Sequence, residues 1–211
     1  MDYFTHQQIA VFIYSTIVFL FSAAVHEYCH ALAATLYGDD LPTLDGRLTL
    51  NPLAHFDILG FFALFVFGIG WAKPVRYNPF NLRNPRFNSV VIALVGPFSN
   101  LVLAILSLFI LKYLPILGIS NEALVMTLTD LLQYAFSINV MLFVLNMLPI
   151  PALDGSNIIT SYFPEPIAQF YWFLQPYGYL ILMILLTIPY SLGIYLYLMN
   201  FISSFLFHLV F

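Results

Sequence analysis

Three ionisable side chains stand close together inside an apolar stretch of the chain. The stretch FLFSAAVHEYCHALAATLY covers residues 19–37, and His26, Glu27 and His30 lie in its middle. On a helix, two residues four apart are separated by about 40° around the axis and about 6 Å along it. Two imidazoles at that spacing can bind one Zn²⁺, while Glu27 projects about 100° away from the first histidine. The spacing therefore predicts two metal ligands and a nearby carboxylate that can act as a base.

The pattern HExxH on a helix is a signature of zinc metalloproteases. Zinc lowers the pKa of its bound water to about 7, and the glutamate accepts the proton as that water attacks a peptide carbonyl. The three fixed positions arise by chance in a chain of this length at a level of about one per cent, so the motif needs support. An ionisable side chain in a membrane helix costs about 2.5–3.5 kcal/mol, and this helix carries three. We therefore favour a metal site over a set of buried polar residues that bridge helices.

A third protein ligand is needed, because catalytic zinc sites combine three protein ligands with a water. Most of the ten acidic residues fall in predicted loops or helix ends, and only Glu27 and Asp154 lie at the inner depth of the proposed core. Pro149 and Pro151 interrupt the helix just before Asp154. Irregular backbone at membrane depth is tolerated where it is buried in protein or lines a watery cavity. Asp154 is the ligand that this elimination favours.

The composition places these residues in a membrane protein. Hydrophobic residues make up 62% of the 211 positions, charged residues only 8%, and the mean hydropathy is +0.92. A soluble domain carries about a quarter charged residues, so this surface is expected to face lipid. The net charge of −4 gives no indication of nucleic-acid binding, and the single cysteine excludes an internal disulfide.

The apolar runs predict an all-α polytopic membrane protein. We expect long helical segments at about 8–36, 88–112, 124–150 and 176–211, and Pro189 leaves open whether the last is one span or two. The chain is therefore expected to have about four to five transmembrane helices. We expect one intramembrane domain over residues 1–211, with a core at about 8–163 and a C-terminal helical segment at about 176–211.

The connection between the first two long helices is expected to be irregular. As a helix, Ile58–Trp71 would reach about 21 Å, short of the roughly 30 Å hydrocarbon core, so we interpret it as a re-entrant or interfacial segment. Asp45-Gly46 within Leu41–Pro52 favours a short β-hairpin, with an ordinary polar connection as the alternative. The sequence AKPVRY at 72–77 could form another short strand.

The basic residues predict the orientation. Four of the six Lys and Arg residues lie at 71–88, in WAKPVRYNPFNLRNPRFN, so this loop is expected to be cytoplasmic. If residues 58–71 do not cross the bilayer, the histidine motif and Asp154 both approach the cytoplasmic side at similar depth. The active site is therefore expected towards the cytoplasm.

Several motifs, in order and spacing, resemble those of the site-2 proteases, which are intramembrane zinc metalloproteases. They are HEYCH at 26–30, GPFSN at 96–100 and NMLPIPALDG at 146–155. GRLTLNPLAHFDILG at 46–60 and GWAKPVRYNP at 70–79 are similar to a compact prokaryotic branch of the family. The resemblance implies that His26, His30 and Asp154 bind zinc and that Glu27 is the catalytic base. It also implies that Asn146 holds or polarises the substrate backbone.

The resemblance implies regulated intramembrane proteolysis in a prokaryotic plasma membrane, with a transmembrane protein as substrate and Zn²⁺ as cofactor. We expect no PDZ-like or CBS-like domain, no nucleic-acid partner, and a predicted hairpin edge at 41–50 with which an extended substrate could pair. A catalytically silent relative that binds membrane helices, and a metal transporter using the same ligands, remain as alternatives. His55 is interpreted as a residue that orders its loop rather than as an accessory ligand, and Cys29 as a packing residue.

Overall fold

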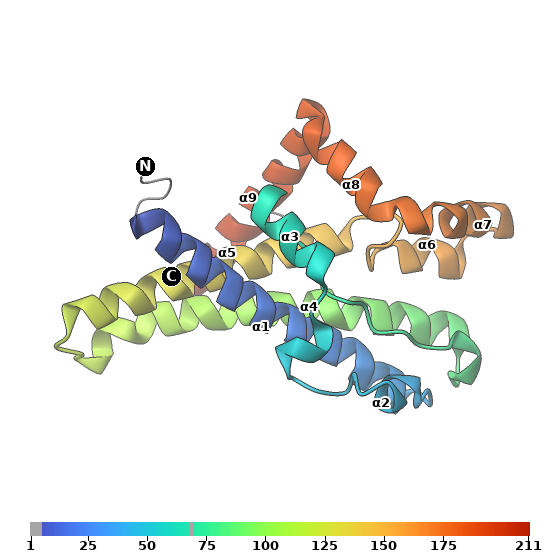
Figure 1. The fold of residues 1–211 in the computed structure, drawn as a ribbon, viewed down its shortest axis with the longest axis horizontal. Coiled ribbons are helices and arrows are strands. Elements are labelled where there is room, and N and C mark those ends of the chain that lie inside the picture. The colour runs from blue at the N-terminus through green and yellow to red at the C-terminus, as the bar shows by residue number, and fades with distance from the viewer. Residues whose placement is uncertain (1–5, 68–69) are drawn as a thin grey trace.

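Three long helices form the centre of the molecule. The computed structural model describes residues 6–67 and 70–211, and every regular element in these residues is helical. The long helices are α1 (His6–Leu36), α4 (Pro85–Tyr113) and α5 (Glu122–Met147). Figure 1 shows α4 and α5 side by side with α1 crossing them, and α1 contacts both. The helices predicted at about 8–36, 88–112 and 124–150 are thus observed.

The C-terminal quarter forms shorter helices, of which α6 and α9 pack against the central helices. They are α6 (Ser156–Tyr162), α7 (Glu165–Leu174), α8 (Gly178–Thr187) and α9 (Pro189–Val210). Ile188 between α8 and α9 is extended, with φ −80° and ψ 120°, as expected for a residue before proline. Pro189 therefore divides the predicted 176–211 segment. Short 3₁₀ turns occur at Pro52–His55, Pro79–Asn81, Leu114–Leu117 and Gln175–Tyr177.

Among the described residues, five helical segments are long and apolar enough to cross a bilayer. This number agrees with the upper end of the predicted four to five, and the chain is an integral membrane protein. The fifth span arises because α7 and α8 together form one candidate span. The five segments are Ile9–Leu36, Pro85–Leu117, Glu122–Met147, Glu165–Thr187 and Pro189–Val210.

The predicted β-hairpin at 41–50 is wrong. A short helix, α2 (Leu41–Leu44), occupies its first half, and the described residues contain no strand. Gly46 has φ +66°, Arg47 N–H donates to the Pro42 carbonyl, and Gly46 N–H donates to the Thr43 carbonyl. This pair of bonds is the Schellman motif that ends a helix. Asp45-Gly46 is therefore a helix C-terminus rather than a hairpin turn.

The rest of the connection contains one further helix and an extended segment. Helix α3 (Ile58–Phe67) has ten residues, about 15 Å long, and is not among the candidate spans. Its placement as a re-entrant element stays a prediction. Residues 70–78 are extended, but the structure assigns them no strand partner within the described parts of the chain, so the short strand predicted at 72–77 is not formed.

Small residues let the central helices approach closely. Ala31 and Ala34 of α1, Ala104 of α4 and Val140 of α5 have no exposed surface. Small side chains at helix interfaces are typical of membrane proteins, where packing and hydrogen bonds hold the helices together. One buried cluster joins α4, α5 and α9 through Ala104, Leu108, Val140, Val144, Leu206 and Val210. These contacts hold in place the helices that carry the polar residues described next.

Candidate metal centre

Helix α1 carries the first two groups of the site. His26 and His30 lie one turn apart, each with 7% of its surface exposed, and their Nε2 atoms are 2.9 Å apart. The alanines at 23, 24, 31 and 34 beside them are buried against α4 and α5. The two rings are therefore buried at the junction of the three long helices.

Each imidazole is held from behind by an oxygen atom that faces its Nδ1 atom. His26 Nδ1 lies 2.7 Å from Asn100 Oδ1, and His30 Nδ1 lies 2.6 Å from the Ile92 carbonyl oxygen. Both oxygens accept hydrogen bonds, so each ring donates from Nδ1–H. In the neutral ring, Nε2 then carries a lone pair, which is the form that binds a metal.

Asp154 reaches the histidines from the loop after α5. Gly155 lies against the end of α5, where an added Cβ would come 2.5 Å from the Leu148 carbonyl oxygen, and its N–H donates to the Asn146 carbonyl at 2.7 Å. This close approach turns the chain so that Asp154 Oδ2 lies 3.1 Å from His26 Nε2 and 3.4 Å from His30 Nε2. The Asp154 side chain is 20% exposed, but Oδ2 itself is buried and has no hydrogen-bond partner in the described structure.

The three converging atoms fit a zinc ion. With zinc–ligand bonds of about 2.0–2.1 Å and tetrahedral geometry, ligand atoms are about 3.3 Å apart. The observed separations are 2.9, 3.1 and 3.4 Å. Two lone pairs and a carboxylate oxygen that face one another repel unless a cation lies between them.

Gly96 of α4 provides the space in which the two rings meet. A Cβ at this position would lie 2.3 Å from His30 Nε2 and 2.8 Å from His26 Cε1. Real Cβ atoms do not approach that closely, so the position requires glycine as long as the rings stay in place. The absence of a side chain at Gly96 therefore gives α4 room for the two imidazole rings.

Glu27 lies beside this group and is held by a different segment. Its side chain is 8% exposed, and Oε2 accepts a hydrogen bond of 2.8 Å from the Val75 N–H in the extended segment 70–78. The same segment is anchored further along by Asp39, a fully buried carboxylate that accepts from Asn78 N–H at 2.6 Å. Glu27 does not belong to the group of three converging ligand atoms.

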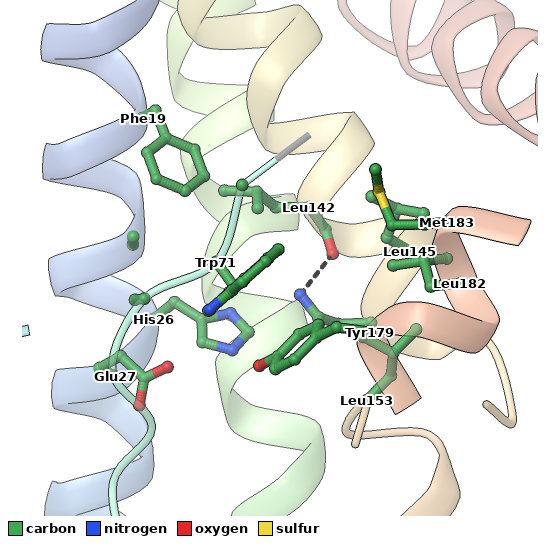
Figure 2. Close-up of a pocket in the computed structure, with 14 residues that line it drawn as sticks. Phe19, His26, Glu27, Trp71, Leu142, Leu145, Leu153, Tyr179, Leu182 and Met183 are labelled. Atoms are coloured by element: carbon green, nitrogen blue, oxygen red, sulfur yellow. Dashed lines mark hydrogen bonds between the residues drawn. The ribbon is translucent and has the colours of Figure 1, made fainter. Parts of the chain in front are cut away.

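A mostly apolar cavity opens beside His26 and Glu27. Trp71 and Tyr179 cover one part of it, with ring planes at 14° and centroids 4.4 Å apart. Figure 2 shows these rings face to face near His26, with Leu145 and Leu182 beyond them. Asn146 lines the same cavity, and its Nδ2 donates to the Leu142 carbonyl at 3.0 Å.

The structure therefore brings together His26, His30 and Asp154, with Glu27 and Asn146 at the adjoining cavity. His55 is elsewhere: it is buried, and its Nε2 lies 2.9 Å from the Thr49 carbonyl, in agreement with an ordering role. Sequence reasoning missed the contacts of Val75, Asp39 and the Trp71–Tyr179 pair. Trp71, one of only two tryptophans in the chain, was the signal in the sequence for the stacked pair.

The comparisons with known proteins agree with this geometry. The profile of Peptidase family M50 matches residues 114–185. The chain is 34% identical to "Putative zinc metalloprotease YwhC" of Bacillus subtilis, over 90% of this chain and 87% of that protein. It is 31% identical to "Putative zinc metalloprotease Rip2" of Mycolicibacterium smegmatis, over 86% of this chain and 69% of that protein. No solved structure matches this chain.

These similarities extend over nearly the whole chain and identify the class of protein. The chain belongs to peptidase family M50, the site-2 protease family. At the level of the family, the sequence-based prediction of an intramembrane zinc metalloprotease is confirmed. The profile match covers Asn146 and Asp154 but not the histidine motif.

Proposed function

We propose that His26, His30 and Asp154 hold one Zn²⁺ and that Glu27 is the base for hydrolysis of a peptide bond. The observation that supports this most directly is the convergence of three candidate ligand atoms, 2.9–3.4 Å apart, from two segments far apart in the chain. The outer nitrogens of both imidazoles are already hydrogen-bonded to oxygen, so the lone pairs face inward.

Glu27 performs the proton transfers in this proposal. A bound zinc supplies a water of lowered pKa and polarises the peptide carbonyl. The Val75 N–H fixes Glu27 Oε2, which leaves the other carboxylate oxygen to accept the proton of the attacking water. Glu27 then returns the proton to the leaving nitrogen. Such a positioned base contributes about 10²–10⁴-fold to the rate.

The substrate is a transmembrane segment of another membrane protein, cut within or near the bilayer. The cavity beside Glu27 is lined mainly by apolar side chains, which suit a hydrophobic segment. Asn146 lies in its wall and uses its Nδ2 within α5, so we assign its carbonyl oxygen the role of accepting a substrate N–H. The substrate must be locally unwound there, because the backbone groups of a helix are already paired.

We place the enzyme in a prokaryotic plasma membrane with its site towards the cytoplasm, and treat residues 1–211 as one intramembrane domain. Helix α3 is then re-entrant, which keeps the two ligand-bearing segments on the same side of the bilayer. The loop at 71–88, with four of the six basic residues, lies on that side. The predicted hairpin edge is absent, so docking onto it is withdrawn.

Cleavage of single-span membrane proteins in detergent, followed by mass spectrometry of the products, tests this function. We expect products with the wild type and none above background with Glu27→Gln, provided that both contain equal zinc. Equal cleavage by the wild type and Glu27→Gln would show that Glu27 is not the base. Zinc uptake into liposomes that requires Asp154, without any cleavage, would favour the metal transporter.

A further inference from the structure

A chain of buried amides leads from α5 through α4 to the ring of His26. Asn139 is 2% exposed and Asn100 has no exposed surface. Asn139 Nδ2 donates to the Ala135 carbonyl at 2.8 Å and to Ser22 Oγ at 2.9 Å. Asn100 Nδ2 donates to Asn139 Oδ1 at 2.9 Å, and Asn100 Oδ1 faces His26 Nδ1 at 2.7 Å.

The direction of every bond in this chain is set by its far end. The Ala135 carbonyl oxygen can only accept, so the amino group of Asn139 must face it. Asn139 therefore presents its oxygen to Asn100. The amino group of Asn100 must then face Asn139, and its oxygen must face His26. The ring can satisfy that oxygen only by carrying a proton on Nδ1, which leaves Nε2 unprotonated towards Asp154.

The two histidines differ in how firmly their surroundings determine which ring nitrogen carries the proton. His30 Nδ1 donates to the backbone carbonyl of Ile92, an oxygen that has no alternative orientation. His26 relies on a side-chain amide that could rotate by 180° and present its NH₂ group instead. In that arrangement the proton would sit on His26 Nε2 and point at the place where the metal binds. Two acceptors of the Asn100 amino group oppose the rotation: Asn139 Oδ1 at 2.9 Å and, with a longer bond, the Ser22 carbonyl oxygen at 3.4 Å.

We propose that Asn139 is a positioning residue: by fixing the orientation of Asn100, it keeps His26 in the tautomer that can bind a metal. This rests on the proposed function, in which His26 is a zinc ligand. Asn139 lies outside the cavity-lining residues and does not contact the three converging atoms. It acts through Asn100, whose side-chain oxygen faces His26 Nδ1. Hydrogen bonds to the ring nitrogen that does not bind the metal commonly orient metal-binding histidines.

A packing role is the competing explanation, because amide side chains also hold membrane helices together. Three variants distinguish the packing role of Asn139 from its positioning role. Asn139→Leu keeps the bulk but removes the oxygen that orients Asn100. Asn139→Asp, with a carboxyl kept neutral by burial, still accepts from Asn100 and donates to the Ala135 carbonyl. Ser22→Ala removes one bond of the same cluster but leaves Ala135 to set the direction, so it is the matched control.

Zinc affinity, measured by competition with a chelator, is the first readout. We expect Asn139→Leu to bind on the order of ten-fold more weakly, as for other changes behind a metal-binding histidine. Asn139→Asp and Ser22→Ala should both stay close to the wild type. Wild-type affinity in Asn139→Leu, or equal weakening in the Leu and Asp variants, would overturn the proposal.

The ring nitrogens of His26 give the second readout, which needs no variant that folds poorly. In metal-free wild type labelled with ¹⁵N-histidine, at a pH well above the ordinary histidine pKa of about 6.5, we expect Nδ1 of His26 to carry a proton. An unprotonated Nδ1 would overturn the proposal. A wild type that binds no zinc would contradict the proposed function alone, because this readout still reports the tautomer.

Discussion

The proposed metal centre has two sides that are built differently. On the side formed by α1, α4 and α5, His26 and His30 are held by buried hydrogen bonds, and Gly96 leaves no room for the rings to move towards α4. On the other side, the extended segment 70–78 and α8 cover Glu27 and the cavity. Here the contact with Glu27 is one backbone hydrogen bond from Val75, and the contact with α8 is one stacked pair, Trp71 with Tyr179.

This difference separates holding the metal from admitting the substrate. A metal site needs its ligands fixed, and the helix side provides buried hydrogen bonds to both imidazole rings. In the proposed mechanism a substrate must reach Glu27, and the cover side offers backbone that is not part of any sheet in the described chain. We therefore expect changes on the helix side to alter zinc binding and changes on the cover side to alter substrate binding.

Glu27→Gln lies between the two sides and should give the largest effect. Glutamine can still accept from the Val75 N–H but cannot take a proton, so hydrolysis should fall about 10²–10⁴-fold while zinc content stays at the wild-type level. Single-turnover cleavage together with metal analysis measures both. Loss of zinc in this variant would mean that Glu27 helps to bind the metal.

Gly96→Ala tests the helix side. The new Cβ would overlap both imidazoles, so the rings must move and zinc affinity should fall about 10–100-fold. Overpacking should also lower the free energy of unfolding by about 1–3 kcal/mol. Gly193→Ala on α9 is the control, because nothing lies within 4 Å of its added Cβ. Equal zinc affinity in the two variants would contradict the fixed arrangement of the rings.

Trp71→Ala tests the cover side. Removing the ring loses a stacked contact worth about 0.5–1.5 kcal/mol and one wall of the cavity, so KM should rise about 2- to 10-fold. Zinc content should not change, because the ring is not among the converging ligand groups. Steady-state cleavage measures KM, and metal analysis measures the zinc content. A variant that loses zinc and keeps its KM would reverse the assignment of the two sides.

Arg76→Ala should give the smallest effect. Arg76, in the segment 70–78, forms an ion pair with Asp45 at 3.0 Å, but the arginine side chain is 76% exposed. Pairs of this kind contribute at most about 1 kcal/mol, so thermal unfolding in detergent should shift little and zinc should stay bound. A large loss of stability would show that the cover is held more firmly than its contacts indicate.

The residues to which we assign the chemistry could be singled out from the sequence because charge is expensive in a membrane helix. This cost singled out His26, Glu27 and His30, and the interrupted helix before Asp154 indicated the second half of the site. The three long helices followed from apolar length.

The connection between α1 and α4 was predicted less well. Asp45-Gly46 fits both a hairpin turn and a helix C-terminus, since both use a glycine with positive φ, and local sequence does not decide between them. The bond from Val75 to Glu27 joins residues 48 positions apart through a backbone N–H, which any residue but proline provides. No residue type marks such a contact. The direction of the amide at Asn139 likewise depends on a backbone carbonyl, that of Ala135 one turn earlier in α5, which no residue type marks.

Zinc content per chain tests the central claim most directly. Elemental mass spectrometry of the detergent-purified wild type should give about one zinc per chain. Asp154→Ala should lose most of it, while Asp130→Ala, at an exposed acid of α5, should keep it. A wild type without zinc even after reloading, or an Asp154→Ala variant with unchanged zinc, would contradict the metal centre described here.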